Sequence, residues 1–134
     1  MASTLKINTL TGVSTAGSIA VTGEGNSTTT NLQQGLAKSW INLDGSGTIA
    51  IEDSFNVGSV TDEGTGAYLT VFSNVFSNAV YCYSGGMLMH TTEGTVRAQD
   101  NSNATTSQFS CDIFSQGSNI DQDHYCVAFH GDLA

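Results

Sequence analysis

The sequence predicts an all-β fold, a small antiparallel β-sandwich or jelly-roll-like domain preceded by an extended N-terminal arm. Turn signals separate short apolar runs about every 8–12 residues, which is typical of a sandwich. Thr, Val, Ile and aromatic residues favour strands, and the abundant Gly, Asn and Asp favour turns. Good helix formers are scarce after position 36. Together these observations disfavour any helical architecture.

The chain has 134 residues, the size of one domain with an appended segment. Residues 1–35 are rich in Gly, Ser and Thr and hold few large apolar side chains. Such a segment cannot form a core of its own and usually acquires order from a partner. We therefore expect an attachment arm at 1–35 and a β-sandwich domain at 36–134.

Three short elements are expected in the arm. The run TLKINTL alternates and predicts a strand at 4–10, and the run at 19–21 predicts another. NLQQG at 31–35 predicts a turn that Gly35 closes. The candidate attachment residues are those of the first strand: Thr4, Leu5, Lys6, Ile7, Asn8, Thr9 and Leu10.

The first half of the domain reads as strands joined by turns. An apolar run at 36–43, which includes the chain's only tryptophan, ends at Asp44-Gly45, a dipeptide that favours tight turns. Alternation resumes at 48–51 and apolar residues continue to 60, followed by a loop at 62–66. A new strand begins at 68, and 73–78 predicts an irregular link.

The second half continues the pattern. The apolar run at 80–89 is interrupted by Gly85-Gly86, which predicts a bulge or a bend between two strands. Alternation at 91–98 and 108–114 predicts two more strands. The unbroken apolar run at 125–129 predicts a last strand that is buried on both faces.

The charge balance excludes several classes of partner. The net charge is −9, and Lys6, Lys38 and Arg97 are the only Lys or Arg residues. Three cations cannot neutralise a nucleic-acid backbone or bind an anionic membrane surface. Charged residues make up 11% of the chain, against the usual quarter. The surface is therefore expected to be rich in Ser, Thr, Asn and Gly, or to be covered by neighbouring subunits.

Neither a membrane span nor a secretion signal is predicted. No apolar run approaches the roughly 20 residues that cross a bilayer. The start MASTLKINTLTGVS lacks the basic stretch and apolar core of a signal peptide. We expect synthesis in a cytoplasm and no membrane insertion.

The three cysteines, Cys82, Cys111 and Cys126, lie inside apolar strand-like runs. Their spacing contains no C-x-x-C pair, so neither a zinc site nor a redox motif is indicated. We expect three buried free thiols that act as small hydrophobic groups.

One segment resembles a known family. Residues 36–72 carry AKSWIN at 37–42, DGSGTIAI at 44–51, DSFNV at 53–57, and Thr61-Asp62 followed by Gly64-Thr65-Gly66. This run is similar to a β domain at the C-terminal ends of fibre-like and other virion proteins of tailed phages, especially marine and cyanophage-type ones. Leu43, Asp44 and Glu52 depart from the commoner residues of that pattern. The opening MASTLKINT resembles the start of small phage virion proteins.

The resemblance implies a structural and binding module, often assembled around a threefold axis. We therefore expect a homotrimeric virion structural protein, made in the host cytoplasm and bound to other virion proteins, either the major capsid protein or tail and fibre proteins. Capsid decoration through the N-terminal arm is favoured, because the chain has no long shaft. The alternative is a tail-fibre component or a fibre tip that binds a receptor or host surface glycan.

No catalytic constellation is predicted. His90, His124 and His130 accompany many Ser and Asp residues, but no G-x-S-x-G elbow is present. Glycoside hydrolysis needs two carboxyl groups that face each other across a sugar. The pairs Glu52/Asp53, Asp62/Glu63 and Asp121/Asp123 are more typical of turns. We expect neither an enzyme nor a cofactor.

The run Asp121-Gln122-Asp123-His124 is the best metal candidate, because two carboxylates and an imidazole lie within four residues. It lacks the D-x-[DN]-x-[DN]-G spacing of a calcium loop. On a threefold axis, His124 or His130 from each chain could ligate an ion. A hydrated loop before the last strand is favoured, so no metal is expected.

Four tyrosines are candidate surface-binding residues: Tyr68, Tyr81, Tyr83 and Tyr125. Alternation places Tyr81 and Tyr83 on one face of their strand and Cys82 on the other. If the tyrosine face points outward, it could contact a receptor or glycan. If it points inward, it belongs to the core or to a subunit interface, which is the favoured alternative.

Overall fold

The computed structural model describes residues 4–13, 19–22, 28–87, 94–99 and 104–134. The chain divides into two compact units, Met1–Leu36 and Ala37–Ala134. The boundary lies one residue beyond the predicted end of the arm.

In the first unit, the described residues form one small hairpin and one helical turn. Strand β1 (Ala20–Thr22) pairs antiparallel with β2 (Thr29–Asn31), and α1 spans Leu32–Gly35. The predicted turn at 31–35 is thus a single helical turn, which Asn31 caps: its Oδ1 accepts from the backbone N–H groups of Gln33 and Gln34. None of the described residues in this unit is buried.

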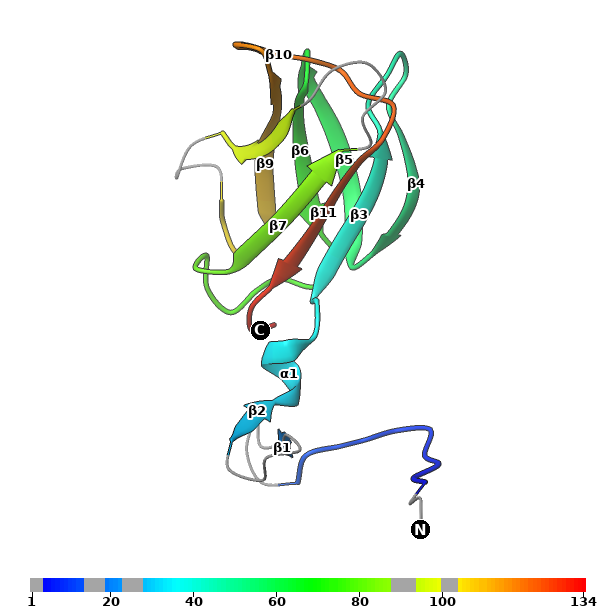
Figure 1. Ribbon diagram of the computed structural model, residues 1–134, viewed down its shortest axis with the longest axis vertical. Helices are drawn as coiled ribbons and strands as arrows, with labels where there is room; N and C mark the ends of the chain where they lie inside the picture. Colours follow the sequence, from blue (N-terminus) through cyan, green and yellow to red (C-terminus); the bar gives the residue numbers. More distant parts are fainter. Residues whose placement is uncertain (1–3, 14–18, 23–27, 88–93, 100–103) are drawn as a thin grey trace. The chain divides into compact units, whose positions relative to one another are not determined.

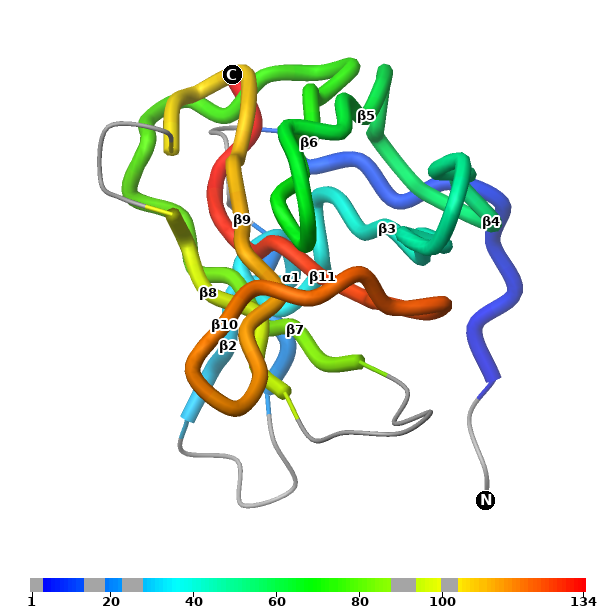
Figure 2. Tube along the Cα trace, turned by 90° about the horizontal axis from the view of Figure 1, so that it is seen from above, coloured from blue at the N-terminus to red at the C-terminus, as the bar shows by residue number. Residues whose placement is uncertain are grey.

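The second unit is a β-sandwich of two antiparallel sheets (Figures 1 and 2). The four-stranded sheet has the order β4-β3-β11-β7, with β3 at Ser39–Asp44, β4 at Ala50–Phe55, β7 at Cys82–Met87 and β11 at Tyr125–His130. The five-stranded sheet has the order β10-β9-β6-β5, and β8 also pairs with β9. Its strands are β5 (Val57–Gly64), β6 (Ala67–Phe72), β8 (Thr95–Ala98), β9 (Gln108–Ser115) and β10 (Ser118–Asn119). The predicted all-β sandwich is confirmed.

Asn56 carries the chain from one sheet to the other between β4 and β5. Its φ of 58° lies in the left-handed region, which asparagine tolerates better than most residues. Its side chain holds the corner, since Nδ2 donates to the carbonyls of Lys38 and Asn74 and Oδ1 accepts from the backbone N–H of Asn74. A single residue therefore redirects the chain by tying three segments together.

The core lies between the two sheets and is dominated by aromatic rings. Tyr68 and Tyr125 stack with their ring centroids 5.5 Å apart. Beside them, an edge-to-face cluster contains Phe72, Phe76, Tyr81, Phe109 and Phe129. Aliphatic side chains from β3, β9 and β11 fill the remaining space: Ile41, Leu43, Ile113 and Val127. Such rings supply most of the apolar burial in a small domain.

Three expectations about strands are wrong. Residues 4–10 form no strand, and none of the described strands pairs with them. Gly85-Gly86 makes no bulge, since β7 pairs with β11 in one uninterrupted register. Strand β11 is buried on one face only: Cys126 is exposed and Ala128 is half-buried. The outer face of the four-stranded sheet is therefore accessible to solvent along β11, where the sequence predicts burial.

The expectation of three buried thiols is right for one cysteine. All three cysteines are free, but only Cys111 is buried, whereas Cys82 and Cys126 are exposed. Cys82 and Cys126 lie on the outer face of their strands, because successive side chains in a strand point to opposite faces and their neighbours point inward. Apolar residues around a cysteine do not decide which face of the strand is covered.

Candidate functional site

The candidate attachment residues at 4–10 are all exposed and irregular. Leu5, Ile7 and Leu10 expose 78%, 50% and 53% of their surface, and Val13 exposes 99%. A lone strand has no partner for its backbone groups, so exposed coil is the expected state of this segment by itself. The role of the segment in attachment stays a prediction.

Two of the four candidate tyrosines lie in the core and cannot contact a ligand at the surface. Tyr68 and Tyr125 are 0% and 1% exposed. The Tyr68 hydroxyl donates to the carbonyl of Gly45, 3.0 Å away. Burial raises the pKa of both phenols, and for Tyr68 the nearby Asp121 carboxylate adds to the shift. These hydroxyls therefore stay protonated, and their role is structural.

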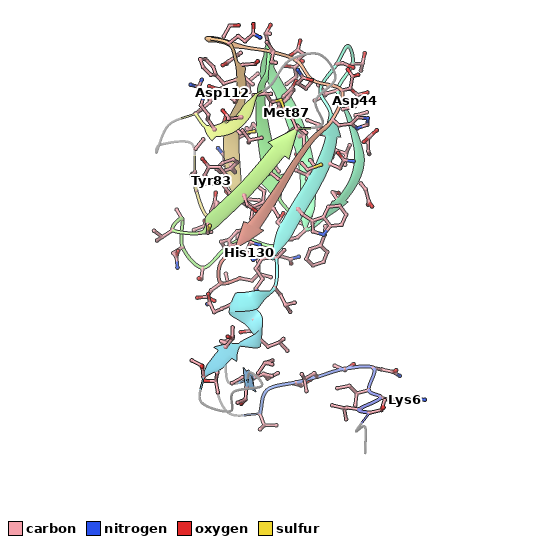
Figure 3. All side chains as sticks on the ribbon, in the orientation of Figure 1. Lys6, Asp44, Tyr83, Met87, Asp112 and His130 are labelled. Carbon is pink, nitrogen blue, oxygen red and sulfur yellow. The ribbon has the colours of Figure 1, made fainter. Side chains whose placement is uncertain are left out.

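Tyr81 and Tyr83 are half-buried and point toward the core. Tyr83 packs on Phe109 with ring centroids 4.8 Å apart, and its hydroxyl accepts from the backbone N–H of Ala98. The Tyr81 hydroxyl donates to the carbonyl of Gln108, and burial raises its pKa to about 12. The predicted alternation holds, and the tyrosine face is the inner one, as favoured. Figure 3 shows Tyr83 and Met87 on β7.

The run 121–124 does not converge on one point. Asp121 Oδ1 accepts from the backbone N–H of Gly66 at 2.6 Å, whereas His124 Nδ1 lies 2.8 Å from Glu52 Oε2. His124 precedes β11 and His130 ends it, so the two imidazoles lie at opposite ends of that strand. No group of three or more His, Cys, Asp or Glu that could hold a metal ion occurs among the described residues.

The other catalytic candidates are also dispersed. In the pair Asp62/Glu63, Asp62 accepts from the backbone N–H of Gly64, whereas Glu63 accepts from the hydroxyl of Ser110 at 2.7 Å. Neighbouring carboxylates on one strand point to opposite faces, so they cannot face each other across a substrate. His90 lies outside the described residues.

The outer face of the four-stranded sheet brings together aromatic and small side chains that are not among the candidates predicted from the sequence. Trp40 on β3 pairs with Phe55 on β4, so the two side chains share the outer face. The same row continues through Ala128 on β11 to Ser84 on β7. Trp40 is half-buried, and Phe55 exposes 52% of its surface. Two aromatic rings thus stand beside two small residues.

A shallow depression of about 410 Å³ lies beside the indole. Its surface is formed by Trp40, Ile41, Ser84, Gly85, Gly86, Cys126, Val127 and Ala128. The depression exists because β7 and β11 present only small groups on this face. At Gly86 an added Cβ would meet nothing within 4 Å, whereas at Gly85 it would lie 3.0 Å from Val127 Cγ2. Gly86 therefore opens the outer face, and Gly85 packs toward the core.

A chain of hydrogen bonds borders the aromatic pair. The register of β3 and β4 shifts after Asn42, so Glu52 is the extra residue of a β-bulge on β4. Its Oε2 accepts from Asn42 Nδ2 at 2.8 Å and lies 2.8 Å from His124 Nδ1. The Cys126 thiol donates to Asn42 Oδ1 at 3.3 Å. Partial burial and the Glu52 carboxylate raise the pKa of Cys126. A polar border thus lies next to the apolar platform.

Sequence reasoning missed this face because it treated Trp40 only as part of the apolar run at 36–43. A signal was available: in the run SWINLD, strict alternation sets Trp40 and Asn42 opposite Ile41 and Leu43. Ile41 and Leu43 are buried, so the indole points away from the core.

Comparisons with known proteins identify no relative: no protein-family model, curated protein sequence or solved structure matches this chain. Among the helices formed by the described residues, none is long and apolar enough to cross a membrane.

Proposed function

We propose that this chain is a structural protein of a tailed-phage virion, a capsid decoration protein that attaches through its N-terminal segment. It is made in the host cytoplasm, acts in the virion as a homotrimer, and contacts the major capsid protein. The observation that carries the proposal is that the described residues of the first unit include no buried one. A segment that exposes Leu5, Ile7, Leu10 and Val13 has apolar surface to bury on a partner.

The energetics indicate how such a segment would attach. Burying the three side chains Leu5, Ile7 and Leu10 contributes roughly 5–9 kcal/mol. Ordering the seven backbone positions at 4–10 costs about 7–14 kcal/mol. Side-chain burial alone therefore does not hold the segment. Addition of the segment as a strand to an exposed sheet edge supplies backbone hydrogen bonds as well. Three arms on one trimer supply avidity.

Full-length variants test the attachment. Leu5→Ser, Ile7→Ser and Leu10→Ser together remove the apolar side chains while the length stays the same. Thr4→Ser, Asn8→Ser and Thr9→Ser form the matched control, because they change only polar positions of the same segment. Binding is measured by co-sedimentation with particles that lack the protein.

We expect the apolar triple variant to lose binding and the control to keep it. Both variants should unfold at the same temperature as the parent, because residues 4–10 are exposed. Normal sedimentation of the apolar triple variant with particles would refute attachment through this segment. Deletion of residues 1–24 should have the same effect as the apolar triple variant.

The second candidate is a tail-fibre component or a receptor-binding fibre tip, and the aromatic pair on the outer face of the sandwich favours it. Copy number separates the two positions. Hundreds of copies in each purified particle indicate decoration, whereas about a dozen indicate a fibre. Cryo-electron microscopy of the particle distinguishes them directly.

A further inference from the structure

We propose that the outer face of the four-stranded sheet is a binding site for neutral oligosaccharides, with the Trp40 indole and the Phe55 ring as its platform. The proposal goes beyond attachment to the particle and does not depend on the N-terminal segment. It rests on the aromatic pair, the depression beside it and the polar border, which the register brings to one face.

The shape fits an extended, flat ligand. The depression is shallow, and its volume of about 410 Å³ lies at the small end of the roughly 300–1,000 Å³ range of ligand sites. Ala128, Ser84 and Gly86 leave its floor low beside the indole. A sugar ring can therefore lie against the aromatic face, where its C–H bonds meet the negative side of the π system.

The polar side chains beside the depression can form hydrogen bonds with the hydroxyl groups of a sugar. Asn42 uses one amide N–H on Glu52 and one acceptor site on the thiol of Cys126, so a second N–H and a second lone pair remain on its amide. The exposed Ser84 hydroxyl lies two strands away from Trp40 in the same row, across Ala128. Hydrogen-bonding groups thus stand on two sides of an apolar floor, the arrangement that orients a polyhydroxylated ligand.

The charges disfavour anionic ligands and a subunit interface at this face. The protein carries a net charge of −9, and Glu52 and Asp53 border the platform, so anionic ligands are repelled. A subunit interface would have to bury the Glu52–His124 pair, whose side chains are 37% and 38% exposed, at a desolvation cost. A neutral sugar lying over the rings leaves those charges hydrated.

The chain provides its own probe, since Trp40 is its only tryptophan. The full-length protein is applied to an array of neutral, sialylated and sulfated oligosaccharides, with cellopentaose and maltopentaose among the neutral ones. Titration of bound neutral sugars into solution follows Trp40 emission and its protection from acrylamide. We expect binding of at least one neutral oligosaccharide, with a shift in emission and reduced quenching.

Two variants locate the site, and one serves as a control. Phe55→Ala removes half of the platform, and Gly86→Thr fills the depression at a position that accepts a side chain. Each should weaken binding at least about tenfold. Phe114→Ala is the control, since this ring lies on the five-stranded sheet under Arg97, and it should leave binding unchanged.

Several results would overturn the proposal. It would be wrong if no neutral sugar binds, if a sugar binds without changing the emission or quenching of Trp40, or if binding survives both Phe55→Ala and Gly86→Thr. Loss of the oligomer in these two variants, measured by sedimentation, would assign the face to a subunit interface instead. Salt-sensitive binding of a Lys-rich peptide at Trp40, in place of sugars, would assign it to a basic protein partner.

Discussion

Two turn glycines with nearly the same positive φ allow a sharp test of how the sandwich is closed. Gly47 has a φ of 61° and Gly66 a φ of 62°. An added Cβ at Gly47 would meet nothing within 4 Å. At Gly66 it would lie 2.5 Å from the carbonyl oxygen of Ile120 and 2.9 Å from that of Ile113. Alanine therefore introduces the same strain at both positions but a steric clash at only one.

The magnitudes follow from these contacts. The left-handed conformation costs alanine roughly 1–2 kcal/mol, and Gly47→Ala should lose about that much. Gly66→Ala adds overpacking of about 1–3 kcal/mol. The clash also falls on backbone atoms that are paired, because the Ile120 N–H donates to the Ile113 carbonyl. We therefore expect Gly66→Ala to cost at least about 2 kcal/mol more than Gly47→Ala.

Urea unfolding of both full-length variants, followed by Trp40 fluorescence, measures the difference. In thermal unfolding, each kcal/mol lost from the free energy of unfolding lowers the midpoint temperature by roughly 4–8 °C for a domain of this size. Gly66→Ala should therefore unfold about 8–16 °C below Gly47→Ala. Equal destabilisation by the two substitutions would refute the close approach of the turn before β6 to the segment after β10.

Three further predictions concern single side chains. In the native protein, Ellman's reagent should modify Cys82 and Cys126 but not Cys111, and all three thiols should react in denaturant; modification of Cys111 without unfolding would contradict its burial. Burial raises the pKa of Cys111 from 9.0 to about 12, so the folded state keeps a proton that the unfolded chain loses, and between pH 9 and 12 this thiol lowers stability by about 1.4 kcal/mol per pH unit, to which the buried tyrosines add above pH 10. Urea unfolding at several pH values measures the slope, which Cys111→Ala should reduce by the contribution of this one thiol. Tyr68→Phe leaves the carbonyl of Gly45 without its donor and should cost about 1–2 kcal/mol in urea unfolding, and an unchanged stability would show that this hydrogen bond contributes nothing.

Most strands could be predicted from the sequence because alternation and turn residues act locally. The segments around β3, β6, β9 and β11 match the expected runs, and β9 spans Gln108–Ser115 where the alternation predicts 108–114. The exceptions depend on pairing over long distances. The Gly85-Gly86 pair remains in a regular strand because β11 aligns with it along its whole length. The run at 4–10 alternates as a strand does, but none of the strands formed by the described residues pairs with it.

The candidate site was less predictable because composition does not reveal which face of a strand is covered. Trp40 and Tyr68 are both aromatic residues in apolar runs, yet Tyr68 is 0% exposed and Trp40 is half-buried. The difference arises from the partner layer. Tyr68 on β6 faces β11 across the sandwich, where it stacks on Tyr125.

The fold class, the acidic charge and the difference between an apolar-poor first segment and a β domain can all be derived from the amino-acid sequence. These properties follow from composition and from periodicities of a few residues. Three features depend instead on how the sheets pair and pack: four tyrosines face the core, Cys126 is exposed, and Trp40 lies next to Phe55 beside a depression that contains Gly86. Local patterns do not predict these features, because strand register and sheet stacking are set by contacts between residues far apart in the chain.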